Sequence, residues 1–167
     1  SYDYDTGGDD YLYVAAGLGG FKNYEGDDLT TVVDATRPVL YGGISSAVTA
    51  NATAVFVADT NDGLIEYDAT TFVKADSNSA SFTNATAYDV ALSGANLFVA
   101  AGSQGLKIFD GSDINTARDS IDTDGIAYSV ALSSDGNYAY VADGSEGLYI
   151  FDVSDSTDIQ LLSHYEA

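Results

Sequence analysis

The chain has 167 residues, enough for one ordinary domain, and its 26 acidic and five basic residues give a formal net charge of −21. A chain this acidic repels phosphate groups, which excludes nucleic acid and anionic membrane surfaces as favoured partners. Cysteine is absent, which excludes disulfides and thiolate sites, and no apolar run approaches the roughly 20 residues that insert into a bilayer. No signal peptide is visible, which favours a mature chain or one domain of a longer protein.

One motif occurs four times along the chain. It reads YVAAGLGGFKNYE from Tyr13, FVADTNDGLIEYD from Phe56, FVAAGSQGLKIFD from Phe98 and YVADGSEGLYIFD from Tyr140, so successive copies start 43, 42 and 42 residues apart. The segment before the motif also repeats, most clearly as AYDVALSGAN in the third copy and AYSVALSSDGN in the fourth. The chain therefore divides into four repeats, at about 1–43, 44–86, 87–126 and 127–167.

Within a repeat, apolar residues alternate with a period of two, which is typical of strands joined by tight turns. In the third repeat this pattern predicts strands at Ala87–Ser93, Asn96–Gly102, Gly105–Asp110 and Ile114–Ile121, the last being the most polar. The second repeat departs most from the pattern, because its opening segment ISSAVTA is a poor strand. No helical segment is evident.

Four strands in a period of about 42 residues are typical of a β-propeller blade. The sequence therefore predicts an all-β fold, a β-propeller of four four-stranded blades forming one domain over residues 1–167. Because the pattern gives the first repeat its own first strand and the fourth its own last strand, a closed four-bladed ring is favoured. Two alternatives stay open: half of an eight-bladed ring made by two chains, and an open array completed by neighbouring chains.

The segments AYDVALSG, YVADGSEGLYIFDVSD and VVDATRPVL resemble the LVIVD repeat of microbial cell-surface β-propellers. The resemblance is strong in the third and fourth repeats and loose in the first two. It implies a propeller fold and an extracellular or cell-surface location, and it implies no particular activity. The prolines usual after the third strand of such repeats are missing from DVSDSTDIQLL.

The residues give no support for an enzyme. The single histidine, His164, lies in the last predicted strand, and nothing in its spacing suggests a nucleophile and an acid beside it. The spacing of two carboxylates that a glycosidase requires is no evidence here, because among 26 acids some pair always has a suitable spacing.

Acidic turns raise the question of calcium. The turns ADTNDG and ADGSEG join the second and third strands of two repeats, and DTDG precedes the fourth repeat. In a propeller these turns share one face, where their oxygens could serve a hard cation. The alternative is that Asp, Asn, Ser and Gly simply form the turns. The candidate calcium ligands are Asp59, Asp62, Asp122, Asp124, Asp143 and Glu146.

Two further patterns concern turns. An acid ends the third strand of every repeat (Glu25, Asp68, Asp110, Asp152), and we expect it to accept backbone N–H bonds in the following turn. The triplet NAT occurs at Asn51 and Asn84, each in a predicted turn where an N-glycosylation acceptor would lie.

The sequence thus favours a non-enzymatic, secreted or cell-surface structural protein that associates with itself as a subunit of an extracellular fibre or surface layer. The alternative is an extracellular module that binds a glycan or peptide, with calcium as a candidate cofactor. Either function calls for partners other than nucleic acid or the membrane interior.

Overall fold

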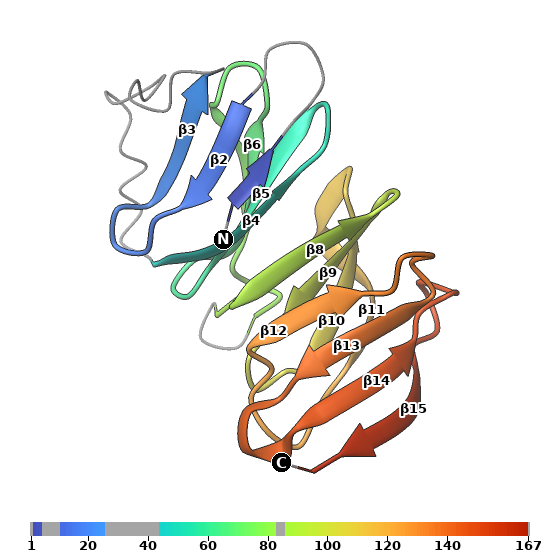
Figure 1. The fold of residues 1–167 in the computed structure, drawn as a ribbon. Coiled ribbons are helices and arrows are strands. Elements are labelled where there is room, and N and C mark those ends of the chain that lie inside the picture. The colour runs from blue at the N-terminus through green and yellow to red at the C-terminus, as the bar shows by residue number, and fades with distance from the viewer. Residues whose placement is uncertain (1, 5–10, 26–43, 83–85, 167) are drawn as a thin grey trace.

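The structure of the chain is a computed structural model, and it describes residues 2–4, 11–25, 44–82 and 86–166. The described residues form four antiparallel sheets, one for each sequence repeat, arranged in chain order (Figure 1). Sheet 1 contains β1 (Tyr2–Tyr4), β2 (Tyr11–Ala15) and β3 (Phe21–Glu25). Sheet 2 contains β4 (Ser45–Ala50), β5 (Ala54–Asp59), β6 (Gly63–Asp68) and β7 (Lys74–Asn78).

Sheet 3 contains β8 (Asp89–Ser93), β9 (Asn96–Ala100), β10 (Leu106–Asp110) and β11 (Asp113–Ile121). Sheet 4 contains β12 (Ser129–Leu132), β13 (Tyr138–Ala142), β14 (Leu148–Asp152) and β15 (Gln160–Tyr165), with a short 3-10 turn at Gly144–Glu146. Each strand pairs with the next one along the chain, so every sheet is a simple meander. The all-β fold and the four-stranded repeat unit are therefore confirmed for the second, third and fourth repeats.

The weak opening segment of the second repeat does form a strand. β4 pairs with β5, but its register shifts between Ser45 and Ala47, as expected of a β-bulge. A fourth strand of the first repeat would fall within residues 26–43, which lie outside the described residues.

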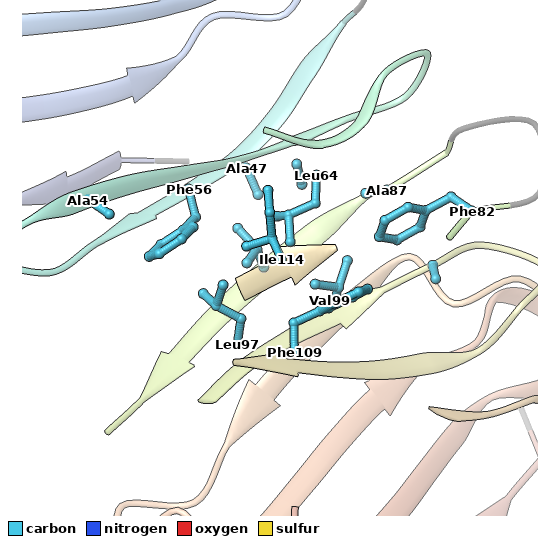
Figure 2. Close-up of a cluster of buried hydrophobic side chains, with 13 residues drawn as sticks. Ala47, Ala54, Phe56, Leu64, Phe82, Ala87, Leu97, Val99, Phe109 and Ile114 are labelled. Atoms are coloured by element: carbon cyan, nitrogen blue, oxygen red, sulfur yellow. The ribbon is translucent and has the colours of Figure 1, made fainter. Parts of the chain in front are cut away.

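Neighbouring sheets pack face to face, and each of the three junctions encloses one apolar cluster. Figure 2 shows the cluster between sheets 2 and 3, where Phe56 and Leu64 of sheet 2 meet Leu97, Val99 and Phe109 of sheet 3. All five of these side chains have a relative exposure of 0%. The inner sheets are thus apolar on both faces, and burial on both sides stabilises them.

Backbone bridges add to two of these junctions. Gly17, in the β2–β3 turn, exchanges hydrogen bonds with Ser45 at the start of sheet 2. Gly102, in the β9–β10 turn, does the same with Ala127 just before sheet 4, at N–O distances of 3.2 and 2.9 Å. The turn after the second strand therefore connects each of these sheets to its successor.

The four sheets form a row in which sheet 1 and sheet 4 lie at opposite ends (Figure 1). The closed four-bladed ring favoured by the sequence would instead bring these two sheets together. The outer face of sheet 4 is correspondingly uncovered, with Leu148 37% exposed. The repeat pattern could not reveal this, because it is the same for closed and open arrangements.

We expect Gly105→Ala to destabilise the fold far more than Gly94→Ala. Both glycines have positive φ angles, of 66° and 58°, so either substitution costs about 1–2 kcal/mol in backbone strain. A Cβ at Gly105 would also collide with the Ile121 carbonyl and lie 2.8 Å from the Thr123 nitrogen, whereas a Cβ at Gly94 meets nothing within 4 Å. Urea unfolding of the two variants measures the difference, and equal losses would contradict the packing described here.

Candidate functional site

The acids that end the third strands act in the turns that follow them. Asp68 Oδ1 accepts hydrogen bonds from the backbone nitrogens of Thr70 and Thr71, at 3.0 and 2.7 Å. Asp110 and Asp152 bind the turns after β10 and β14 in the same way. These bonds hold the pKa of all three carboxyls below the ordinary value. Their recurrence thus has a structural explanation, as the sequence suggested; Glu25 side-chain contacts lie outside what the structure describes.

Asp143 connects the two acidic turns nearest to sheet 4. Its side chain is fully buried, and its two oxygens accept hydrogen bonds from Thr123 Oγ1 at 2.7 Å and from the Gly125 nitrogen at 2.8 Å. Asp143 therefore holds the segment 122–125 against the turn between β13 and β14. The loop is close-packed, since a Cβ at Gly125 would lie 2.8 Å from Glu146 Cγ.

The remaining polar groups of this region also have protein partners. Tyr149 donates its hydroxyl to Asp124 Oδ2 at 3.2 Å, and His164 stacks on the Tyr149 ring with centroids 4.0 Å apart. Asp122 Oδ1 accepts the Thr123 N–H, and His164 Nε2 lies at the Glu146 carbonyl. The single histidine thus has an aromatic and a backbone neighbour.

Asp59 and Asp62 lie in the β5–β6 turn of sheet 2. Asp59 is 3% exposed, and its Oδ1 accepts the N–H groups of Asn61 and Asp62 at 2.9 and 3.1 Å. The pKa of Asp62 is raised, first by burial and then by the neighbouring Asp59 carboxylate. One oxygen of Asp62 is buried and makes no hydrogen bond.

The six candidate calcium ligands thus belong to two turn regions, one in sheet 2 and one at sheet 4. In the described ranges, no group of three or more His, Cys, Asp or Glu side chains is placed to hold a metal ion. The calcium site stays a prediction, while the hydrogen bonds of Asp59 and Asp143 show that both acids shape turns.

Of the two sequons, only Asn51 is described. It lies in the turn between β4 and β5, where its Oδ1 accepts the N–H groups of Thr53 and Ala54, both at 2.9 Å. Asn84 lies outside the described residues. Glycosylation at either position stays a prediction.

The feature that the sequence did not reveal is the apolar surface of the fourth repeat. Ten large hydrophobic residues of the described chain are exposed, and seven of them lie between residues 126 and 165. They are Ile126, Tyr128, Tyr138, Leu148, Leu161, Leu162 and Tyr165. The repeat pattern indicates a buried position for Leu148, since the equivalent Leu106 of sheet 3 is 0% exposed. Only the arrangement of the sheets shows that no sheet of the described chain packs over it.

The described part of the chain contains no helix with the length and apolar character that a membrane span requires. The exposed apolar residues of the fourth repeat are a separate feature of this acidic chain, and exposed apolar patches often mark protein–protein contacts.

Substitution of Asp152 by Asn should reduce stability at neutral pH and have little effect in acid. Since the folded pKa is lowered, the carboxylate stabilises the fold above the ordinary value of 3.8, and the contribution is lost as the pH falls through the folded pKa. Urea unfolding of both proteins between pH 7 and 2 measures this difference, with Glu166→Gln as the control for loss of one exposed charge. A difference that persists unchanged in acid would contradict the turn role.

Asp143→Ala should lower the free energy of unfolding by about 1–3 kcal/mol for each buried donor left without a partner. Asp143→Asn, which keeps one acceptor oxygen, should lose less. Both are measured by urea unfolding in chelator and in excess calcium. Equal losses in the two buffers indicate the structural role, whereas a calcium-dependent gain that only the wild type shows would indicate a metal site.

Comparisons with known proteins agree with this architecture. Among curated proteins, no match was found. Among solved structures, the chain is similar to the computationally designed Ika8 protein, with a TM-score of 0.72 and 11% identity over 97% of this chain and 48% of that one. It is also similar to the designed Ika4 protein, with a TM-score of 0.60 and 11% identity over 72% of this chain and 71% of that one.

These similarities concern the fold alone, and the chain spans about half the length of the Ika8 chain. The family description "LVIVD repeat" matches residues 85–114 and 124–167, which correspond to sheets 3 and 4. LVIVD repeats are associated with β-propeller structure, in agreement with the four successive sheets. The second half of the chain therefore contains LVIVD repeats.

Proposed function

We propose that this protein is a non-enzymatic structural protein, secreted or displayed at the cell surface, that associates with itself as a subunit of an extracellular fibre or layer. The observation that carries the proposal is the uncovered apolar surface of sheet 4. The LVIVD repeats support the extracellular or cell-surface location, because the repeats of this chain resemble those of microbial cell-surface propellers.

The hydrophobic effect favours covering this surface. Full burial of one Leu-sized side chain contributes about 1.5–3 kcal/mol relative to leaving it in water. Leu148 and Tyr165, which pair on the outer face of sheet 4, are 37 and 59% exposed, so a partner that covered them would gain part of this free energy at each position. A sheet from another subunit is a natural cover, because sheets pack through their side-chain faces.

We also propose that the propeller is completed between chains. Of the three closures considered, the open row supports either half of an eight-bladed ring or an open array, in which sheet 4 meets another chain. A contact between two different surfaces generates closed rings when the rotation closes and filaments when it does not.

The net charge opposes assembly. Subunits of charge −21 repel one another over a distance set by the ionic strength, and the screening length falls from about 30 Å at 0.01 M salt to about 3 Å at 1 M. Assembly should therefore depend on salt or divalent cations, with the apolar surface supplying the attraction.

A second candidate function is glycan or peptide binding, favoured by one observation. The rings of Tyr88 and Tyr128 contact each other at an interplanar angle of 57°, with centroids 4.9 Å apart, and Tyr128 is 47% exposed, as suits a ring that receives a sugar. A monomeric protein with saturable glycan affinity that Tyr128→Ala abolishes would favour this function over self-association.

We expect the purified protein to be dispersed in about 0.01 M salt and assembled in about 1 M salt, because screening removes the repulsion and leaves the apolar attraction. Analytical ultracentrifugation measures the size distribution, and negative-stain electron microscopy of the high-salt sample shows whether fibres or layers form. Particles of one subunit at every salt concentration would contradict self-association.

A further inference from the structure

The three junctions inside the chain all use the same two sets of positions. We call the face that a sheet turns to the next sheet its forward face, and the opposite one its back face. Between sheets 3 and 4, the forward face contributes Phe98, Ala100, Leu106 and Ile108, and the back face contributes Ala139, Val141, Tyr149 and Phe151. None of these eight residues is more than 4% exposed.

The repeat alignment finds equivalent residues at the other junctions. Phe56, Ala58 and Leu64 form the forward face of sheet 2, and Leu97, Val99 and Phe109 form the back face of sheet 3. Tyr13 and Phe21 form the forward face of sheet 1, and Val55, Val57, Ile65 and Tyr67 form the back face of sheet 2. In each junction, the forward face thus supplies one aromatic residue and a second large residue, which is either aliphatic or aromatic. The back face supplies a Val and an aromatic residue.

Among the described residues, two such sets have no sheet opposite them. The forward face of sheet 4 carries Tyr140, Ala142, Leu148 and Ile150, at positions equivalent to Phe98, Ala100, Leu106 and Ile108. Leu148 and Ala142 are exposed and the other two are half-buried, whereas their sheet 3 equivalents are at most 1% exposed. The forward face of sheet 4 thus has the residues of an internal junction, but no described sheet packs against it.

The back face of sheet 1 is the matching set. It carries Leu12, Val14, Lys22 and Tyr24, equivalent to Leu97, Val99, Lys107 and Phe109 of sheet 3, and all four are half-buried. A lysine also occupies the position equivalent to Lys22 inside the chain, at the junction between sheets 2 and 3. Lys107 is only 8% exposed, and its burial lowers its pKa while the nearby Asp122 partly offsets the effect.

The turn after the second strand of sheet 4 also resembles the turns that bridge to a following sheet. Gly17 and Gly102, with φ angles of 58°, bridge to the following sheet. Gly144 occupies the equivalent position with a φ of 61°, and the structure describes no bridge from it to another sheet. Gly144 thus has the backbone φ of the two bridging glycines, at the end of the row.

Charge favours contact at this face. The two central rows of paired residues on the forward face of sheet 4 contain no acidic or basic residue, in a chain with 26 acids. These rows are Ala131, Tyr140, Ile150 and Ser163, and Ser129, Ala142, Leu148 and Tyr165. The back face of sheet 1 supplies Lys22, so the two faces meet without apposed carboxylates at these positions.

We propose that the forward face of sheet 4 packs against the back face of sheet 1 of a second copy of this chain, continuing the row with the same contacts as inside it. This proposal rests on the proposed self-association and names its interface. The Ika8 chain, of which only 48% is covered by this fold, shows that such a row occurs within a larger structure. The contact is head-to-tail, because the two faces differ.

The test uses one variant for each face of the full chain. Leu148→Asp puts a charge into the forward face of sheet 4, and Tyr24→Asp puts one into the back face of sheet 1. Tyr165→Asp, at a 59% exposed position, and Lys22→Glu repeat the test with less risk to folding. Val73→Asp is the matched control, because Val73 is 48% exposed in the connection between β6 and β7 and belongs to neither face. Circular dichroism and thermal unfolding confirm that each variant is folded.

In about 1 M salt, we expect the wild type and Val73→Asp to assemble, and each face variant alone to sediment as a single subunit. An equimolar mixture of a sheet 4 variant and a sheet 1 variant should form a one-to-one dimer and nothing larger, since each partner keeps one intact face. Ultracentrifugation measures all three results.

Two outcomes overturn the proposal in distinguishable ways. If the wild type assembles and the folded face variants assemble equally well, or if the mixture stays monomeric, the interface is wrong and self-association stands. If the wild type itself stays monomeric at every salt concentration, the proposed function fails and this interface fails with it.

Discussion

Burial of both faces of a sheet is the constraint on which the rest of this structure depends. Each sheet of three or four short strands is too thin to shield its own side chains, and its apolar residues alternate between two faces. A neighbouring sheet must therefore cover each face. Sheets 2 and 3 satisfy this requirement inside the chain, which explains why Val55, Val57, Phe98 and Phe109 are at most 1% exposed.

The sheets at the two ends of the row also have two apolar faces, but only one face of each is covered by a described neighbouring sheet. Sheet 4 repeats the sequence of sheet 3 closely, so it carries a second apolar face whether or not a neighbour follows. In an isolated subunit this face costs free energy in water, and in an assembly it becomes the attractive surface. The two central rows of the forward face of sheet 4 carry no charged residue, while acids elsewhere give the chain its repulsive field.

The sequence alone predicted the repeated part of the fold well. The period of about 42 residues, the alternation of apolar residues and the turn residues specified the strands of the third repeat to within a few positions. The turn role of Asp68, Asp110 and Asp152 also followed from sequence, because the acid recurs before each turn. These features are local, and local patterns are sufficient to specify them.

The arrangement of the sheets could not be predicted in the same way. Leu106 and Leu148 occupy equivalent positions in nearly identical motifs, yet one is 0% and the other 37% exposed. Their difference arises from what lies beyond the sheet, which no local pattern encodes. For the same reason, the sequence could not place the six candidate calcium ligands relative to one another; the structure places them in two turn regions, where Asp59 and Asp143 bind backbone N–H groups.

Cryo-electron microscopy of the assembled protein would show which sheets meet where one copy ends and the next begins. We expect an unbroken succession of sheets, with Leu148 and Ile150 of one copy buried against Val14 and Tyr24 of the next, as Leu106 and Ile108 are buried against sheet 4. Copies joined through other surfaces, with the outer face of sheet 4 left in solvent, would contradict it.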